Sequence, residues 1–223
     1  MEAFRGLCTS VLLSTDPHPP GSILITSTQP SEGKTTVASN LAISLAALGH
    51  RVLLVDADMR KPSLHEIFKI SDPSERGLAS YLACQMDWRS TVLHSKSKGL
   101  DVLLGGAVPS NSVELLFSSD RMRALISESM REYKFVIIDS PPLMTVADSR
   151  ILAALVEAVI LVIRSGATPL AFVQQAECQL RAVRANVIGI ILNNIRLDRD
   201  SYYGRYGYSY FKPRDTTLEP TLT

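Results

Sequence analysis

The 223-residue sequence is poor in cysteine, in aromatic residues and in net charge. Its cysteines, Cys8, Cys84 and Cys178, lie far apart without a paired spacing, so we expect free thiols, which suit a reducing compartment. Lys and Arg total 23 against 22 Asp and Glu, whereas domains that bind nucleic acid through its phosphates carry a marked basic excess. The overall charge therefore gives no reason to expect nucleic acid as a partner.

Long hydrophobic runs are also lacking. The most apolar stretch, residues 151–163, contains Glu157, and a membrane span needs about 20 apolar residues. The first residues, MEAFRGLCTS, are too charged, and their apolar part is too short, for a signal peptide. We expect neither a signal peptide nor a membrane-spanning segment in these residues.

Short apolar runs rich in β-branched residues recur along the chain instead. They are almost wholly apolar rather than alternating, which is typical of strands covered on both faces in a parallel sheet. Helical patterns lie between them, over residues 35–48, 120–132 and from Pro169 to about residue 185. This order predicts an α/β fold with a doubly wound, mainly parallel sheet. The expected strands are residues 23–26, 52–55, 100–104, 135–138, 158–163 and 187–192.

The hydrophobic pattern also predicts how the chain is organised. A short helix over residues 2–14 is separated from the first strand by the segment TDPHPPG. After Asn194 the pattern ends, and the remaining residues are polar, aromatic and interspersed with glycine. We therefore expect one domain over residues 1–194 and a flexible tail over residues 195–223.

A phosphate-binding loop is expected where the first strand ends. The segment TQPSEGKTT follows that strand, and a helix follows at once. In such a loop, backbone N–H groups and the helix N-terminus face phosphates, the lysine adds a point charge, and the threonine hydroxyl binds Mg²⁺. Thr28 stands where the usual pattern has glycine. The predicted nucleotide-binding residues are Ser31, Glu32, Gly33, Lys34, Thr35 and Thr36.

Three carboxylates follow expected strands at the same edge of the sheet. Asp56 and Asp58 come from VDAD, and Asp139 comes from IIDSPP. Mg²⁺ is usually held by one or two carboxylates together with phosphate, and an aspartate at the end of a buried strand is otherwise poorly placed. Helix capping would explain any single one of them. The three together favour a Mg²⁺-dependent nucleotide site.

The segments ITSTQPSEGKTT, VLLVDADMRKP and FVIIDSPP resemble the Walker A, A′ and B motifs of the bacterial tyrosine kinases (BY-kinases) of polysaccharide production. The resemblance spans residues 2–210 and includes GGAVPSNSVELL, with Ser112 where proline is usual. It also includes NVIGIILN, whose Asn193 matches the position that faces adenine in related NTPases. DADMRKP is its most specific part, because Arg-Lys-Pro attached to this motif is rare elsewhere. The resemblance implies a P-loop NTPase fold and an ATP- and Mg²⁺-dependent protein-tyrosine autokinase.

The resemblance also implies a role for each matching residue. Lys34 would hold the β- and γ-phosphates, and Thr35, Asp58 and Asp139 would organise the Mg²⁺ site. Asp56 would accept the tyrosine proton, although it could exchange roles with Asp58. The implied catalytic set is Lys34, Asp56, Asp58 and Asp139.

A tyrosine cluster near the C-terminus is the expected phosphoacceptor. Gly204 and Gly207 discourage a helix or strand there, and the interleaved polar residues leave no apolar face for packing. An aromatic platform for single-stranded nucleic acid would need a second basic element, and Arg205 has none beside it. The predicted acceptors are Tyr202, Tyr203, Tyr206, Tyr208 and Tyr210.

The N-terminal helix resembles the Glu-x-x-Arg-x-x-Arg helix that helps to close a ring of subunits in the family. Glu2 and Arg5 match it, and Cys8 stands in place of the last arginine. The resemblance thus implies a ring-like homo-oligomer, a membrane-embedded activator domain or protein, and a tyrosine phosphatase as partners. It places the chain in the cytoplasm at the inner face of the membrane, regulating polysaccharide polymerisation or export.

Two other interpretations share this sheet. Chromosome-partitioning and division-site ATPases carry a signature lysine five residues before the Walker lysine and lack a tyrosine tail, whereas that position here is Gln29. A non-catalytic nucleotide-binding regulator would not need Lys34 and the three aspartates together. The sequence favours the kinase.

Overall fold

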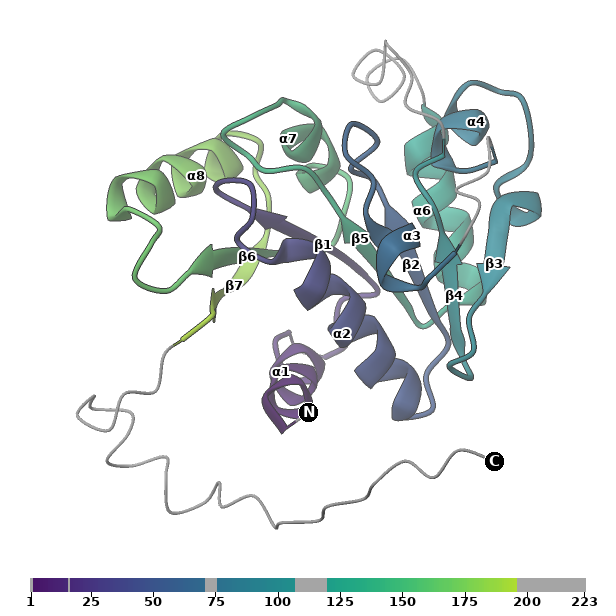
Figure 1. Ribbon diagram of the computed structural model, residues 1–223, viewed down its shortest axis with the longest axis horizontal. Helices are drawn as coiled ribbons and strands as arrows, with labels where there is room; N and C mark the ends of the chain where they lie inside the picture. Colours follow the sequence, from purple (N-terminus) through teal and green to yellow (C-terminus); the bar gives the residue numbers. More distant parts are fainter. Residues whose placement is uncertain (1, 16, 71–75, 107–119, 196–223) are drawn as a thin grey trace.

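A computed structural model describes residues 2–15, 17–70, 76–106 and 120–195 of the chain. Its centre is a seven-stranded sheet in the order β3-β4-β2-β5-β1-β6-β7 (Figure 1). All neighbouring strands are parallel except β3, which runs antiparallel to β4. The strands are β1 (Ser22–Ser27), β2 (Val52–Asp56), β3 (Val92–His94), β4 (Leu100–Leu103), β5 (Phe135–Asp139), β6 (Ala158–Arg164) and β7 (Val187–Asn193).

Helices cover both faces of the sheet, as a doubly wound fold requires. One core lies under α1 (Glu2–Leu12), α2 (Lys34–Ala47) and α3 (Leu64–Ile67). The other lies under α4 (Leu78–Leu82), α6 (Asp120–Glu132), α7 (Asp148–Ala153) and α8 (Leu170–Ala182), and a 3₁₀ turn, η1 (Trp88–Thr91), precedes β3. Side chains alternate between the two cores along each strand, so Ile23 and Ile25 face α1 and α2 while Leu24 faces the opposite layer.

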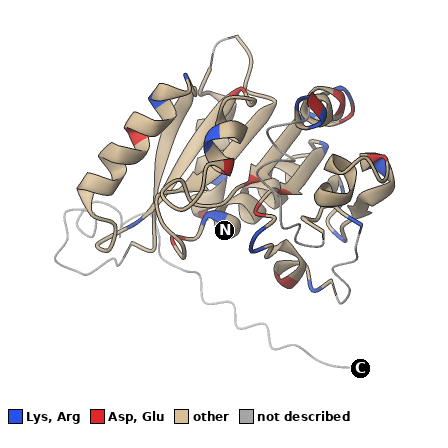
Figure 2. Ribbon diagram, turned by 90° about the horizontal axis from the view of Figure 1, so that it is seen from above, with Lys and Arg blue, Asp and Glu red and all other residues tan. Residues whose placement is uncertain are grey.

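The central strands are fully buried, which explains why they read as continuous apolar runs. Every residue of β1, β2 and β5 is buried. Figure 2 shows the same feature as strands without charged residues along most of their length, with the charges on helices and loops. The predicted fold class is therefore confirmed, and all six expected strands are present within a residue or two of their expected ends.

The helices expected over residues 2–14, 35–48, 120–132 and from Pro169 onward are also present, as α1, α2, α6 and α8. The elements that the sequence pattern did not predict are β3, α3, α4, η1 and α7, each at most six residues long. Such elements are shorter than two turns of a helix or two full alternations of a strand, so they leave no period to detect. The apolar stretch 151–163 divides into the end of α7 and most of β6.

Helix α1 packs beside α2 through Cys8 and Val11, which are almost fully buried (Figure 1). The three cysteines are free, as predicted. None of the helices in the described ranges is both long enough and apolar enough to cross a membrane. The five tail tyrosines and residues 107–116 of the GGAVPSNSVELL segment lie outside the described residues.

The strand order brings three loops to one edge of the sheet. In the β-ladder, β5 lies between β1 and β2, with Asp139 paired to Ile25 on one side and to Asp56 on the other. The chain winds from β1 outward through β2 and later crosses back to β6 on the far side of β1. Ligands of open α/β sheets bind at the carboxyl ends of the strands near such a reversal, which is where the predicted site residues emerge.

Candidate active site

The loop between β1 and α2 has the backbone shape of a phosphate cradle. Ser31 and Gly33 have positive φ angles of 65° and 93°, so the chain curls before α2 begins at Lys34. The φ angle of Gly33 strains any other residue, and a Cβ atom there would lie 2.1 Å from the Asn193 side-chain nitrogen, which would have to move. The first-turn N–H groups of a helix have no partner within the helix, so those of α2 can bind an anion.

A hollow of about 330 Å³ lies beside this loop. Its three walls are the loop and the start of α2, the turn after β2, and the loop after β5, with lining residues in the ranges 30–36, 58–63 and 141–146. Ser31, Gly33, Lys34, Thr35 and Thr36, all predicted from sequence, line it together with Asp58. The structure therefore brings together residues that the chain supplies from three separate segments.

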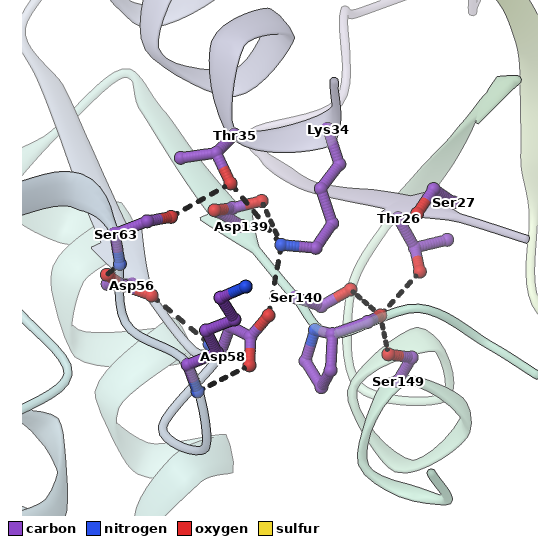
Figure 3. A network of polar contacts seen from close by, with 12 residues as sticks. Thr26, Ser27, Lys34, Thr35, Asp56, Asp58, Ser63, Asp139, Ser140 and Ser149 are labelled. Carbon is purple, nitrogen blue, oxygen red and sulfur yellow. Dashed lines mark hydrogen bonds and ion pairs between the residues drawn. The ribbon is translucent and has the colours of Figure 1, made fainter. Parts of the chain in front are cut away.

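Lys34 is the central cation of the site. Its Nζ atom lies 3.0 Å from Asp58 Oδ2 and 3.8 Å from Asp139 Oδ1, and it donates a hydrogen bond to Thr35 Oγ1 at 3.3 Å (Figure 3). Burial alone would lower the pKa of Lys34, but the carboxylates of Asp139 and Asp58 outweigh it and raise the pKa above its usual value. The ammonium group therefore stays charged.

Asp139 is fully buried. Its Oδ1 atom is ion-paired with Lys34 and the nearby Thr35 hydroxyl acts to lower its pKa, but neither carboxylate oxygen has a hydrogen bond of ordinary geometry within the part of the chain that the structure describes. Burial raises the pKa of Asp139 to about 7, against the opposing effect of Lys34. Buried polar atoms nearly always have partners, and unpaired ones call for an explanation. A hydrated Mg²⁺ ion fits, because its bound waters would supply the missing donors next to Thr35 and Asp58.

Asp56 is held differently, although it ends the neighbouring strand. Its Oδ2 atom accepts hydrogen bonds from the backbone N–H groups of Ser63 at 3.0 Å and Leu64 at 3.1 Å, at the start of α3. Its Oδ1 atom accepts a bond from Asp58 N at 3.3 Å. Burial raises the pKa of Asp56 to about 6, and the two backbone bonds oppose that shift. Asp56 therefore does cap the start of α3, as the alternative from the sequence allowed for a single aspartate. It also lies beside the carboxylates of Asp58 and Asp139.

Asp58 faces the hollow from the turn after β2. Its Oδ1 atom accepts a hydrogen bond from Lys61 N at 3.1 Å, which leaves Oδ2 on the side of Lys34. In the described residues, no group of three or more His, Cys, Asp or Glu side chains is arranged to hold a metal ion by itself. A Mg²⁺ ion here would thus take ligands from Thr35, from one or two of these carboxylates and from the nucleotide phosphates.

The side chain of Glu32 points into the protein rather than into the hollow. Its carboxylate is buried and accepts hydrogen bonds from Thr28 Oγ1 at 2.9 Å, from Gln29 N at 2.8 Å and from the hydroxyl of Thr168. Its backbone oxygen accepts a bond from Asn193 Nδ2 at 2.9 Å. Any contact between Glu32 and a nucleotide would therefore use its backbone, while the side chain braces the loop.

Two threonines take part in this brace. Thr28, which stands where the usual pattern has glycine, donates its hydroxyl hydrogen to the Glu32 carboxylate. Thr168, in the loop before α8, joins the same network and also accepts a bond from Arg164 N at 2.9 Å. No motif in the sequence singled out Thr168. The only indication in the nearby sequence is that Thr168 lies between the end of β6 and Pro169.

The loop after β5 is fixed by a second set of hydrogen bonds. The carbonyl oxygen of Pro141 accepts bonds from Thr26 Oγ1 at 3.0 Å, from Ser140 Oγ at 3.3 Å and from the Ser149 hydroxyl (Figure 3). Thr26 and Ser149 belong to β1 and α7, so three elements meet at this carbonyl. The wall of the hollow below Lys34 is thus held in place by the core.

Comparisons with known proteins agree with this geometry. A family model described as an AAA domain matches residues 22–188. The tyrosine-protein kinase YwqD of Bacillus subtilis is 38% identical over 206 residues, which cover 92% of this chain and 86% of that protein. The solved structure of the kinase domain of Escherichia coli tyrosine kinase Etk superposes with a TM-score of 0.83 at 35% identity, covering 87% of this chain and 75% of that chain. The chain belongs to the BY-kinase family.

Some relatives of this BY-kinase are much longer than the region that matches this chain. The chain matches 26% of the length of the tyrosine-protein kinase Etk of Escherichia coli, at 35% identity. The septum site-determining protein MinD of Pyrococcus horikoshii, solved with Mg-ADP, superposes with a TM-score of 0.64 at 25% identity, over 77% of this chain and 69% of MinD. The predicted family and the P-loop NTPase fold are confirmed, and the individual roles of the site residues remain predictions.

Proposed function

We propose that this BY-kinase is an ATP-dependent autokinase that phosphorylates the tyrosine cluster of a neighbouring copy. The observation that carries the proposal is the meeting of Lys34 with Asp58 and Asp139 beside a loop shaped for phosphate. Relatives with at least 30% identity over most of the chain are named tyrosine-protein kinases, which supports tyrosine as the acceptor.

The nucleotide would be bound mainly through its phosphates. The N–H groups of the loop and of the first turn of α2 would surround them, and Lys34 would neutralise the β- and γ-phosphates. Thr35, Asp58 and Asp139 would hold Mg²⁺, which withdraws charge from the phosphoryl oxygens when it is bound. Asn193 touches the loop at Gly33 and Glu32, and its predicted place near adenine stays a prediction.

Asp56 is the proposed acceptor of the tyrosine proton. In the transfer, the bond between the γ-phosphorus and the oxygen of ADP breaks, and a bond from that phosphorus to the tyrosine oxygen forms. The phenolic proton passes to the carboxylate. A pKa of about 6 leaves Asp56 mostly ionised at neutral pH, and a tyrosine hydroxyl, with a pKa near 10, releases its proton as charge leaves the oxygen. Asp58 is the alternative acceptor.

Subunit assembly is proposed through α1. Glu2 and Arg5 lie on its exposed side as a loose pair, 3.9 Å apart, while Cys8 is buried against the body of the domain. Glu2 and Arg5 are thus available to a neighbouring subunit in a ring, and the third position of the motif is not. We place this assembly at the cytoplasmic face of the membrane, with a membrane-embedded activator and a phosphatase, in control of polysaccharide polymerisation or export.

The direct test compares wild-type protein with Lys34→Met. With Mg·ATP, the wild type should accumulate phosphotyrosine, and Lys34→Met should lose at least about a hundredfold in rate, because the phosphates lose their nearest fixed cation. Phosphotyrosine blotting measures the rate, and thermal unfolding shows that the variant is folded. Wild-type labelling in Lys34→Met would remove the proposed role of Lys34.

The structural likeness to MinD favours one alternative, an ATPase that positions other molecules. Gln29 stands at the position of that group's signature lysine, and its backbone N–H donates to Glu32. The same protein should then hydrolyse ATP in response to DNA or lipid without labelling tyrosine. That result would replace the kinase proposal.

A further inference from the structure

The turn after β2 carries two cations that the mechanism above does not use. Arg60 and Lys61 both line the hollow, on the wall formed by the turn after β2. Lys61 N donates to the backbone oxygen of Asp58 and to its Oδ1 atom, each at 3.1 Å, and Met59 is fully buried. The turn is therefore fixed on both sides of Arg60.

Arg60 is held from behind by a buried carboxylate. Its Nε atom lies 3.3 Å from Asp148 Oδ2, at the start of α7, and Asp148 is fully buried. The other carboxylate oxygen of Asp148 has no hydrogen-bond partner within the described residues. A buried carboxylate needs a counter-ion, and removal of one partner of such a pair is strongly unfavourable. Asp148 therefore has a physical reason to keep Arg60 in one place.

Arg60 also lines the hollow, so its side chain contacts both Asp148 and this space. The Arg60 side chain is 42% exposed, and the Nε contact with Asp148 is the one recorded for it in the described part of the chain. A guanidinium presents five N–H donors in a planar fork that matches the oxygens of a phosphoryl group. The donors that do not contact Asp148 are thus available at the wall that Lys34 faces.

We propose that Arg60 binds the terminal phosphoryl group of the nucleotide, the group that is transferred, and that Asp148 is its positioning residue. The inference rests on the proposed function, in which that group passes from ATP to a tyrosine hydroxyl. Phosphoryl transfer is accelerated mainly by positioning and by cations placed against the charge on the phosphoryl oxygens. Lys34 and Arg60 would enclose that group from two walls.

The first test measures binding and needs no catalysis. A fluorescent ADP analogue reports the affinity of the full chain for Mg·ADP and, by displacement, for the non-transferable ATP analogue AMP-PNP. Arg60→Gln should bind Mg·ADP as wild type does and bind Mg·AMP-PNP about tenfold more weakly, because only the latter carries the terminal phosphate. Arg150→Gln is the matched control, since Arg150 is exposed on α7 and does not line the hollow.

The second test asks whether Asp148 acts through Arg60. Asp148→Asn should weaken Mg·AMP-PNP binding without changing Mg·ADP binding, and the double variant with Arg60→Gln should be no weaker than Arg60→Gln alone. A merely structural role of Asp148 would weaken both nucleotides equally. If Asp148→Asn does not fold, Arg60→Lys decides, because it keeps the charge but loses the fork and should recover only part of the lost affinity.

A kinetic measurement shows whether Arg60 contacts the transferred phosphoryl group or the acceptor peptide. On a peptide with the sequence of residues 198–212, Arg60→Gln should lower kcat about a hundredfold and leave the KM for the peptide unchanged. A raised KM for the peptide with unchanged AMP-PNP affinity would overturn the inference, because Arg60 would then bind the acceptor peptide rather than the nucleotide. Equal loss of both nucleotides, or no loss of either, would also overturn it. If the wild type labels no tyrosine, the proposed function fails, while the binding comparison still judges Arg60.

Discussion

The three aspartates at the carboxyl edge of the sheet look equivalent in sequence but are held in different ways. Asp56 accepts backbone hydrogen bonds from the start of α3, Asp58 pairs closely with Lys34, and Asp139 is fully buried with a longer ion pair to Lys34. The difference comes from the backbone, since β2 continues into a turn that returns over Asp56 while β5 leaves Asp139 beside Lys34. We therefore expect their substitutions to have separable effects.

Substitution of each aspartate by asparagine tests this separation. Asp58→Asn and Asp139→Asn should weaken Mg²⁺-dependent nucleotide binding, because each removes a negative charge from beside the metal. Asp56→Asn should spare binding and lower the transfer rate, since the amide oxygen can still accept the two bonds that anchor α3 and only the longer bond from Asp58 N is lost. Magnesium titrations with a fluorescent nucleotide and initial rates of autophosphorylation measure the two effects. Normal binding and normal transfer in all three variants would refute the assignment.

The raised pKa of the buried Asp139 predicts how nucleotide affinity depends on pH. Mg²⁺ favours the ionised carboxylate, and Asp139, with a pKa of about 7, loses its proton between pH 6 and 8. Affinity for Mg·ADP should therefore rise over this range, by at most about tenfold per pH unit for one proton. Calorimetric titrations at pH 6, 7 and 8 measure it, and Asp139→Asn should flatten the profile. An equally steep profile in that variant would assign the proton to another group.

Stability of the nucleotide-free protein should change in the opposite direction. Between about pH 4 and pH 7 the folded chain keeps protons on Asp56 and Asp139 that the unfolded chain has released. The contribution of these two groups to the free energy of unfolding therefore falls as the pH rises through this window. Thermal unfolding of wild type and Asp139→Asn at pH 5 and 7 measures the difference, which should be smaller in the variant.

At the scale of elements, the phosphate loop is braced by two segments distant in sequence. Thr168, before α8, and Asn193, at the end of β7, both bond to Glu32. The edge strand β7 and the loop after its neighbour β6 thus help to set the shape of a loop that begins at the end of β1. Rigid placement of a phosphate cradle requires such support, because its N–H groups stabilise charge only when their directions are fixed in advance.

Thr168→Val tests the brace. The buried Glu32 carboxylate loses a donor, so the free energy of unfolding should fall by about 1–3 kcal/mol and nucleotide affinity should drop. Thr9→Val is the control, because the Thr9 hydroxyl is exposed and bonds only within α1, so it should change stability by less than about 0.5 kcal/mol. Urea unfolding and nucleotide titration measure both variants. Equal effects of the two substitutions would show that Thr168 does not support the loop.

The same elements show what could be predicted from the sequence. The strands of the central sheet and the long helices were found because burial on two faces gives apolar runs and a long helix repeats its pattern over several turns. The short edge strand β3 and the one-turn α3 have no such repeat. The Lys34 and aspartate cluster was found from strand-end positions, whereas Thr168 and Asp148 were missed because their partners, Glu32 and Arg60, lie 136 and 88 residues away in sequence.

At the scale of the whole molecule, net charge connects the proposed reaction to assembly. The chain carries a formal charge of +1, and each phosphotyrosine adds about −1.5 to −2, so five of them would add roughly −8 to −10. Neighbouring subunits would then repel one another. Because the exposed Glu2 and Arg5 are weakly held within one chain, an assembly that depends on them has little to oppose this repulsion.

Phosphorylation should therefore disperse the assembly, and more completely at low salt, where the charges are less screened. Sedimentation velocity before and after incubation with Mg·ATP, at 50 and 500 mM NaCl, measures this change. A chain with all five tail tyrosines replaced by phenylalanine is the control and should keep its size. Dispersal of that control by Mg·ATP would assign the change to nucleotide binding rather than to phosphate on the tail.

The most direct test of the central claim mixes two variants, each of which lacks one half of the reaction. One is Lys34→Met with an intact tail, and the other has wild-type Lys34 but phenylalanine in place of Tyr202, Tyr203, Tyr206, Tyr208 and Tyr210. We predict that, with Mg·ATP, phosphotyrosine forms on the tail of the Lys34→Met subunit at a rate that rises with protein concentration. An unlabelled Lys34→Met subunit, together with wild-type self-labelling at a rate independent of concentration, would contradict transfer between subunits.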